Sequence, residues 1–233
     1  MLICIFTGFS SGLPLYILIS LLPARLRSEG VNLKAIGLFA LINLPFTFTY
    51  NGNAFSQMSM SCNGWVGCGN QSAIDATNSR TGGNLFTSSI PNNTLAPWFK
   101  DMGANFPLGS GSMRHGLVGT DVYAFQWNNA VGSGFTDGSA ITISFQVNIY
   151  GPASTNPGRI DLLYGPSSVT IAGAAAIGIE DAFGGSGHFI NALNGSATLI
   201  TTTGIWPGSG NGYSLVPCKE PRYLTIRRRR VDV

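Results

Sequence analysis

The sequence has little charge. Only 10% of its 233 residues are Asp, Glu, Lys or Arg, whereas an ordinary globular protein has about 25%. Residues 1–50 carry a net charge of +2, residues 51–217 hold four cations against seven acids, and residues 218–233 carry +4. The long central region is therefore mildly acidic and lacks the basic surface that binds nucleic acid, so we expect no nucleic acid partner.

Residues that build metal and catalytic sites are also scarce. The only histidines, His115 and His188, stand far from each other and from any second close pair of cysteines, which excludes a zinc site. Neither neighbourhood contains a nucleophile elbow, and the sparse acids offer no pair suited to glycoside hydrolysis. We therefore predict that the protein is not an enzyme.

The four cysteines are too few and too scattered for a disulfide scaffold; they are Cys4, Cys62, Cys68 and Cys218. Cys62 and Cys68 lie close in sequence, but a two-residue turn at Asn63-Gly64 would place Cys62 opposite Trp65 and Cys68 opposite Ser59. Their side chains would then lie on opposite faces. We expect both to be small buried side chains rather than a bridge.

The amino-terminal residues are the exception to an otherwise polar sequence. Met1 to Pro23 carry no charge and are long enough to cross a bilayer as a helix. A second apolar run, Ala35 to Phe48, contains Pro45 and is short for a span, so we expect a partial helix, a re-entrant piece or the beginning of a longer span. A cleaved signal peptide fits less well, because no basic residue precedes the apolar core.

Three stretches of this segment carry a resemblance to a known family. They are Gly8 to Leu15, Leu21 to Arg27 and Leu33 to Phe39. The match covers residues 1–47 and resembles the first helix and the start of the second in muropeptide permeases of the major facilitator superfamily. That family needs many further spans, and none follows Tyr50, so the resemblance implies an apparent chimera with a borrowed membrane segment.

Residues 51–217 have the pattern of a β domain. Ile141 to Ile149 alternate apolar and polar residues without a break, and Ile160 to Tyr164 continue the alternation after a Gly-Pro and Asn-Pro-Gly loop. Further strand candidates are Ala54 to Met60, Trp65 to Cys68, Val122 to Trp127, Val169 to Ile179 and Ala197 to Thr203. We predict a mainly β fold, an antiparallel β-sandwich of the jelly-roll kind, preceded by one or two apolar helices.

The order of several short motifs resembles a β-sandwich module of secreted and surface proteins of Bacteroidetes-like bacteria. The motifs are Ser61 to Gly69, Leu95 to Met102, Tyr123 to Trp127, Ile143 to Tyr150 and Ala175 to Ile179. The resemblance covers residues 51–217 and implies an extracellular or periplasmic location. Lys100 replaces one of two acids that usually follow the Pro-Trp pair.

The candidate ligand-binding residues are Trp65, Trp98, Trp127 and Asp101. The tryptophans are either core anchors or exposed platforms that stack on sugars. Glu180 and Asp181, with nearby carbonyls, are the candidate ligands for a calcium ion, but no calcium-loop spacing supports them, so we expect no cofactor.

Together these patterns predict three regions: a membrane-helix-like segment, residues 1–50; a β-sandwich domain, residues 51–217; and a basic disordered tail, residues 218–233. We expect a non-catalytic surface module for binding or adhesion, whose partners are membrane lipid through residues 1–47 and a glycan or surface protein. The alternatives are a truncated permease-like membrane protein and a carbohydrate-active enzyme whose acids the sequence does not reveal.

Overall fold

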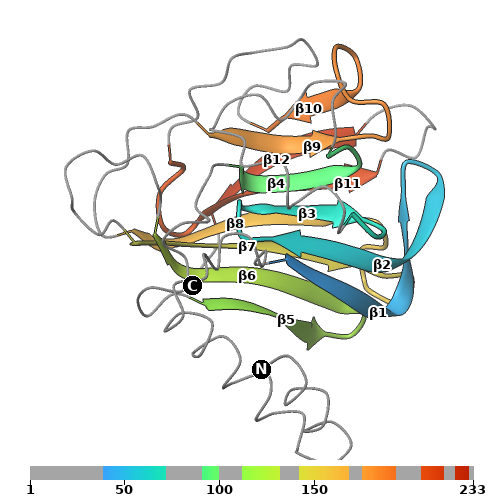
Figure 1. Ribbon diagram of the computed structural model, residues 1–233, viewed down its shortest axis with the longest axis horizontal. Helices are drawn as coiled ribbons and strands as arrows, with labels where there is room; N and C mark the ends of the chain where they lie inside the picture. Colours follow the sequence, from blue (N-terminus) through green and yellow to red (C-terminus); the bar gives the residue numbers. More distant parts are fainter. Residues whose placement is uncertain are drawn as a thin grey trace, which may run out of the picture. The chain divides into compact units, whose positions relative to one another are not determined.

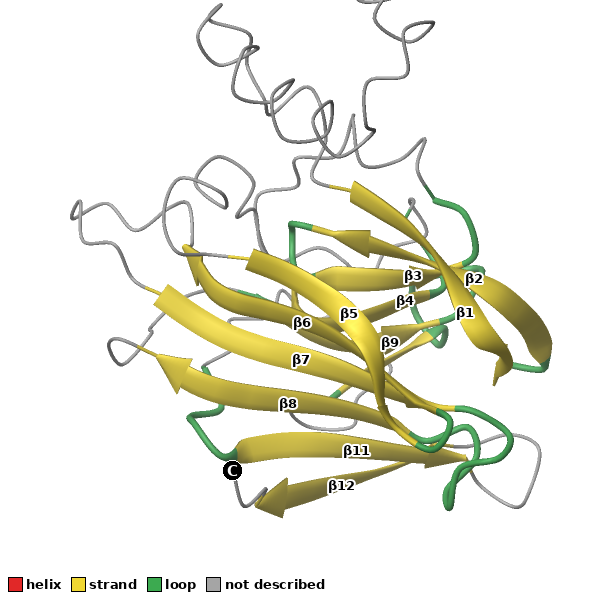
Figure 2. Cartoon of the chain, turned by 90° about the horizontal axis from the view of Figure 1, so that it is seen from below, coloured by secondary structure: helices red, strands yellow, loops and turns green. Residues whose placement is uncertain are grey.

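The computed structural model describes residues 39–71, 91–99, 112–131, 142–167, 175–192, 206–217 and 224–230. The described residues form two six-stranded antiparallel sheets (Figure 1). Sheet A contains, in spatial order, β1 (Phe39–Tyr50), β2 (Asn53–Ser61), β3 (Trp65–Cys68), β4 (Thr94–Phe99), β9 (Ala176–Glu180) and β10 (Phe189–Asn191). Sheet B contains β5 (Ser112–Gly119), β6 (Val122–Val131), β7 (Thr142–Tyr150), β8 (Ile160–Ser167), β11 (Asn211–Pro217) and β12 (Leu224–Arg230), which lie side by side in Figure 2. No described residue is helical. A mainly β, sandwich-like fold is therefore confirmed.

The alternation predicted for residues 141–149 explains how sheet B contributes to the core. On β7, Ile143, Phe145, Val147 and Ile149 are buried, and polar residues occupy the intervening positions. Burying such a side chain contributes about 1.5–3 kcal/mol. Two hydrogen bonds then join the sheets: the Trp127 indole donates to the Ser61 carbonyl at 2.9 Å, and the Tyr164 hydroxyl donates to the Pro97 carbonyl at 2.6 Å.

Aromatic rings fill the space between the sheets. Trp206 packs edge-on against Trp98 and Tyr164, with both centroid distances 5.1 Å, and Trp127 stacks on Phe145 at 4.9 Å. Edge-to-face and offset-stacked arrangements are the ones that aromatic pairs prefer. These rings therefore belong to the hydrophobic core.

The second apolar run differs from its prediction. Residues 39–50 of the predicted membrane-like segment form β1, which pairs with β2 from Phe39 opposite Ser61 to Tyr50 opposite Asn53. Ile42, Phe48 and Tyr50 are buried in the core of the sandwich. Pro45 lies within the register shift between Asn43 and Phe48, and an edge strand tolerates proline there because it needs fewer hydrogen bonds. The sheet thus extends to the amino-terminal side of Asn51.

Residues 1–38, including Met1 to Pro23, lie outside the described residues, so the predicted first helix stays a prediction. The described part of the chain contains no helix long and apolar enough to be a membrane span. The contacts divide the chain into two units, Met1–Gly37 and Leu38–Val233.

The predicted disordered tail is also partly a strand. β12 pairs with β11 from Leu224 opposite Pro217 to Arg230 opposite Asn211. β12 is an edge strand of sheet B, a position at which sheets commonly have charged residues.

The β2–β3 turn is one residue longer than predicted. Ser61 pairs with Trp65, and the amide of Gly64, at a left-handed φ of 73°, donates to the Ser61 carbonyl at 3.3 Å. This three-residue turn with glycine at its end shifts the register by one, so Cys68 lies opposite Met58 rather than Ser59. The prediction of two buried thiols is confirmed: no disulfide joins Cys62 and Cys68, and both are buried.

Candidate functional site

The β9–β10 loop, Asp181 to His188, is the described segment in which exposed functional groups gather. Its two ends are joined because the Asp181 amide donates to the His188 carbonyl at 2.9 Å. Within the loop, Gly184, Gly185 and Gly187 have φ of 60°, 80° and 84°. Glycine populates this left-handed region without steric cost, so the glycines allow the chain to fold tightly back on itself.

The Asp181 carboxylate organises the loop. One oxygen, Oδ1, accepts the backbone amides of Phe183 at 2.8 Å and Gly184 at 3.3 Å. The other, Oδ2, lies 2.9 Å from Nδ1 of His188. A carboxylate only accepts, so Nδ1 carries the proton and Nε2 is the second imidazole nitrogen available to a ligand when the ring is neutral. The His188 side chain is 45% exposed.

Phe183 is the most exposed large hydrophobic residue that the structure describes, at 70%. Its ring lies 5.2 Å from the His188 ring, tilted by 55°. An aromatic ring left in water beside an imidazole and a carboxylate gives a small surface with one apolar face and two polar groups. A sugar or an apolar side chain of a partner fits such a surface.

Sheet A supports the loop from its base. The Asn93 amide donates to the Asp181 carbonyl at 2.8 Å, and the Asn92 side-chain amide donates to the Ala182 carbonyl at 3.2 Å. The Tyr50 hydroxyl donates to the Glu180 carbonyl at 2.7 Å. Burial, together with the nearby Cys68, Glu180 and Asp181, raises the pKa of Tyr50 well above its ordinary value. The hydroxyl thus stays protonated and keeps its role as donor.

The candidate tryptophans do not lie in this loop. Trp65, Trp98 and Trp127 are all buried, with at most 2% of each residue exposed. A sugar cannot reach a ring inside the sandwich, so these three residues are core anchors and not stacking platforms. Asp101 lies outside the described residues.

The candidate calcium ligands are engaged separately. Glu180 is buried and its Oε1 accepts the Thr94 hydroxyl at 2.9 Å. Asp181 is committed to His188 and to the loop amides. Within the described ranges, no three His, Cys, Asp or Glu side chains come together as a metal-binding group.

His188 and Asp181 form a hydrogen-bonded dyad. The described side-chain contacts of His188 are with Asp181 and Phe183. His115 is bound instead to the Tyr123 hydroxyl, 2.8 Å from its Nδ1. A hydroxyl nucleophile within hydrogen-bond reach of the base is the geometry that acyl transfer requires.

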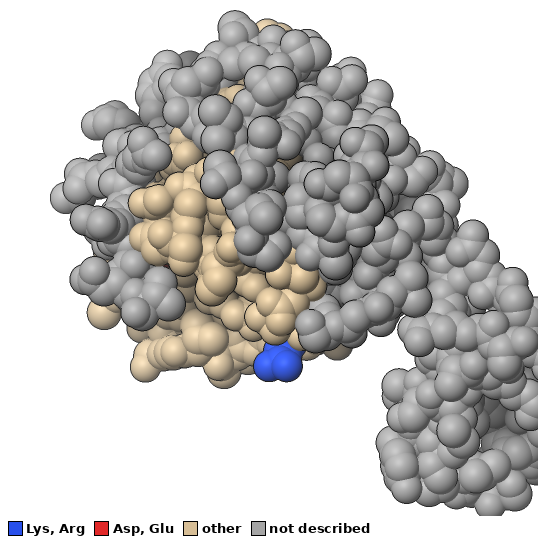
Figure 3. All heavy atoms as spheres, turned by 90° about the vertical axis from the view of Figure 1, so that its left-hand side faces the viewer, with Lys and Arg blue, Asp and Glu red and all other residues tan. Residues whose placement is uncertain are grey.

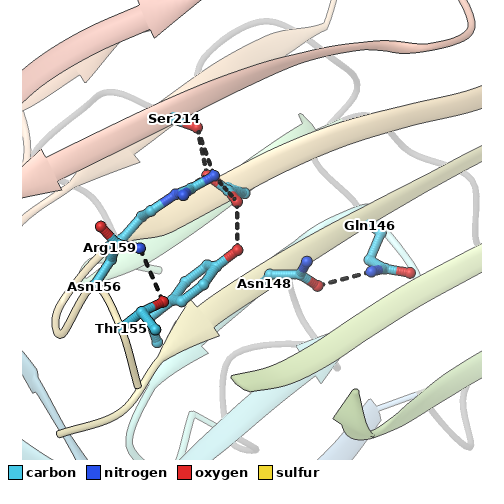
Figure 4. A network of polar contacts seen from close by, with 8 residues as sticks. Gln146, Asn148, Thr155, Asn156, Arg159 and Ser214 are labelled. Atoms are coloured by element: carbon cyan, nitrogen blue, oxygen red, sulfur yellow. Dashed lines mark hydrogen bonds and ion pairs between the residues drawn. The ribbon is translucent and has the colours of Figure 1, made fainter. Parts of the chain in front are cut away.

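A second polar cluster lies in sheet B around Asp161. Figure 4 labels two of its members, Arg159 and Ser214. Arg159 binds both carboxylate oxygens, Ser214 donates to Oδ1 at 2.5 Å, and the Tyr150 hydroxyl donates to Oδ2 at 2.8 Å. The Arg159 guanidinium also lies over the Tyr150 ring, 4.9 Å from its centroid. Because Asp161 is buried and all these groups are paired, the cluster ties β7, β8 and β11 together rather than presenting a site.

On the side drawn in Figure 3, the described atoms belong to uncharged residues, apart from basic atoms at their lower edge.

Phe183 is not among the candidate residues predicted from the sequence, because the aromatic candidates were all tryptophans. A usable signal was present: Phe183 is a single aromatic residue followed by Gly-Gly-Ser-Gly, a stretch that predicts a turn rather than a core strand. An aromatic residue within such a stretch has few neighbours that could bury it.

Comparison with known proteins identifies one family. Residues 36–215 match the model of a family described as NIDO related. A protein of Haemophilus influenzae described as uncharacterized is 46% identical over 46 residues, which is 20% of this chain and 11% of that protein. The chain thus spans about a tenth of the length of that relative. No solved structure matches.

Proposed function

Because the chain belongs to the NIDO-related family, we propose that it is a non-catalytic surface module that binds a glycan or surface protein through its β9–β10 loop. The observation that carries this proposal is the exposed Phe183 ring beside the His188–Asp181 pair. Phe183 supplies an apolar contact, His188 a hydrogen-bonding nitrogen and Asp181 a partly exposed carboxylate.

A glycan is the ligand class that suits these groups best. A pyranose ring has a face of C–H groups that packs on an aromatic ring and a rim of hydroxyls that donate and accept hydrogen bonds. Phe183 would take the apolar face, while Nε2 of His188 and the Asp181 carboxylate would take hydroxyls. A partner protein would use Phe183 as a hydrophobic anchor instead.

We propose further that the amino-terminal apolar segment tethers the module to a membrane, with the β domain outside the cytoplasm. The support is the uncharged run Met1 to Pro23. Protease added to spheroplasts that express the intact chain tests this: cleavage of a membrane-held β domain supports the tether, and recovery of the domain in the soluble fraction contradicts it.

Binding is tested with the full chain on a glycan array and on intact bacterial cells. Phe183→Ala should weaken binding at least tenfold, as loss of a central aromatic contact usually does. His188→Gln tests the polar contact. Val118→Ala is the matched control, because Val118 is similarly exposed, at 60%, but lies on β5 of sheet B, whereas the β9–β10 loop belongs to sheet A.

The outcomes separate the ligand classes. Binding to arrayed sugars that Phe183→Ala abolishes supports a glycan. Binding to cells that survives removal of their glycans but still depends on Phe183 identifies a protein partner. If Phe183→Ala and Val118→Ala bind like the parent chain, the loop is not the binding surface.

A further inference from the structure

The four edge strands of the two sheets differ in the features that protect them from pairing with a further strand. Strands at a sheet edge present unpaired backbone groups, and natural proteins guard them with proline, bulges, charges or short length. In sheet A, β1 has Pro45 at a register shift, and β10 has three residues. In sheet B, β12 contains the run Arg227 to Arg230.

The fourth edge, β5, has a single Arg, Arg114, and its register shift lies only at its carboxyl end, between Leu117 and Gly119. It is eight residues long, contains no proline, and among the described strands has β6 as its only neighbour. Its pairing with β6 is regular from Ser112 to Leu117. Leu117 and Val118 are 56% and 60% exposed. A regular edge with exposed apolar residues is suited to strand addition.

We propose that a second copy of this chain pairs with β5, antiparallel and across a two-fold axis, so that the two copies of sheet B become one continuous sheet. A two-fold axis perpendicular to the sheet leaves each side chain on the same face of the sheet. Paired residues must therefore both be odd-numbered or both even-numbered, and the axis lies midway between one residue of β5 and the same residue of the second copy. An axis at His115 places Arg114 opposite Gly116 and Met113 opposite Leu117.

This register places His115 opposite its own copy and is self-complementary on either side of it. The apolar pair Met113 and Leu117 occurs twice, once on each side of the axis. Arg114 meets no like charge, because Gly116 has no side chain and a Cβ built on it would meet no atom within 4 Å. An axis at Gly116 would instead place Arg114 opposite Val118, which pairs a charge with an apolar residue. The match of β5 with itself is why we infer a second copy rather than an unrelated peptide.

Charges introduced at Gly116 test both the dimer and its register. Gly116 does not have a left-handed φ, so a side chain can be added there without backbone strain. Gly116→Glu would lie opposite the Arg114 of the second copy, and Gly116→Lys would repel it. Because each change acts twice in a symmetric dimer, the dissociation constant should fall about fivefold for Glu and rise about fivefold for Lys.

The measurement is sedimentation equilibrium of the full chain at pH 8 in a density-matched detergent. The double change Arg114→Glu with Gly116→Lys should have the same dissociation constant as Gly116→Glu, since it exchanges the two charges of that pair and keeps their attraction. Thr49→Glu and Thr49→Lys are the matched controls, because Thr49 is exposed on β1, the edge strand of sheet A, and should leave association unchanged.

Two results would overturn the proposal. One is a chain that stays monomeric up to about 0.5 mM, a concentration at which even a small interface associates. The other is weakening by both Gly116→Glu and Gly116→Lys, which would place Gly116 opposite itself. Neither result depends on the β9–β10 loop, so ligand binding through Phe183 can succeed or fail separately.

Discussion

The Arg159 guanidinium holds the Asp161 carboxylate through two parallel hydrogen bonds, 2.7 Å from Nε to Oδ1 and 2.6 Å from a terminal nitrogen to Oδ2. Burial works to lower the pKa of Arg159, but the hydrogen bond and charge of Asp161 outweigh it and raise that pKa. The arginine is therefore charged at every pH at which the domain is folded, and its charge depends on Asp161 for compensation.

Asp161→Asn should destabilise the domain by about 2–4 kcal/mol. The substitution leaves a largely buried guanidinium without its counter-charge and weakens the acceptors for Ser214 and Tyr150, and the loss of one partner of a buried pair is costly. Urea unfolding followed by tryptophan fluorescence measures the change. His188→Gln changes a more exposed hydrogen bond, that between His188 and Asp181, and should cost less than about 1 kcal/mol. Equal losses for the two variants would contradict this account.

A second prediction concerns the hydrogen bond through which Trp127 links the two sheets. Trp127→Phe removes the indole that donates to the Ser61 carbonyl and leaves a cavity in the core. The Ser61 carbonyl keeps the Gly64 amide as a donor, so the lost hydrogen bond costs about 0.5–1.5 kcal/mol, and the cavity adds to that cost. We expect a loss of about 2–4 kcal/mol in free energy of unfolding, with an unchanged urea m-value if the fold is kept.

The control for Trp127→Phe is Tyr164→Phe, which removes the other hydrogen bond between the sheets but keeps the aromatic ring. Tyr164 donates to the Pro97 carbonyl, so its loss should be smaller, about 1–2 kcal/mol. If Trp127→Phe costs no more than Tyr164→Phe, the indole is not a principal link between the sheets.

β7 could be predicted from the sequence and β1 could not, because the alternation of apolar and polar residues is visible in β7 and hidden in β1. In β7 each inward apolar residue is followed by a polar one, so the period of two is visible without the structure. In β1 the outward or half-buried positions include Leu41, Leu44 and Phe46. These residues hide the alternation of Ile42, Phe48 and Tyr50, and the run has the composition of a membrane segment.

The site was harder to predict because exposure depends on contacts between distant residues. The buried Trp127 indole donates a hydrogen bond to the carbonyl of Ser61, 66 positions away in the sequence. Nothing in the sequence near Trp127 indicates that contact. Phe183 is exposed because the Asp181 carboxylate fixes a tight glycine loop, and none of the described strands covers the ring. Residue type alone thus directed the predicted ligand-binding site to three tryptophans that are buried.

A third prediction concerns the two buried thiols. Burial raises the pKa of Cys68 far above its ordinary value, and the thiolate is the reactive form. In a Cys4→Ser, Cys218→Ser background, Cys62 and Cys68 should not react with a chromogenic disulfide reagent at pH 8 until urea unfolds the chain. The expected yield is then two thiols per chain. Rapid labelling of the folded protein would show that the β2–β3 turn opens readily.

Stability should also fall steeply at alkaline pH. Burial raises the pKa of Tyr50 and Tyr164 well above 10, and burial with the Asp161 hydrogen bond and charge raises that of Tyr150 to about 12. Above pH 10 the unfolded chain loses phenolic protons that the folded chain keeps, so the unfolded state binds fewer protons and stability decreases as pH rises. The stabilising contribution is complete below pH 10 and, for Tyr150, is lost by about pH 12.

Urea midpoints measured between pH 8 and pH 11.5 test this, with tyrosinate absorbance as an independent record of ionisation. Tyr150→Phe should lower stability at pH 8, because Asp161 loses a donor, but it should also make the decline above pH 10 shallower, because one titrating group is gone. A variant whose stability falls as steeply as that of the parent chain would show that Tyr150 ionises alike in the folded and unfolded states. The burial of the phenol against Arg159 and Asp161 argues against that result, since ionisation would bring a second negative charge next to the carboxylate.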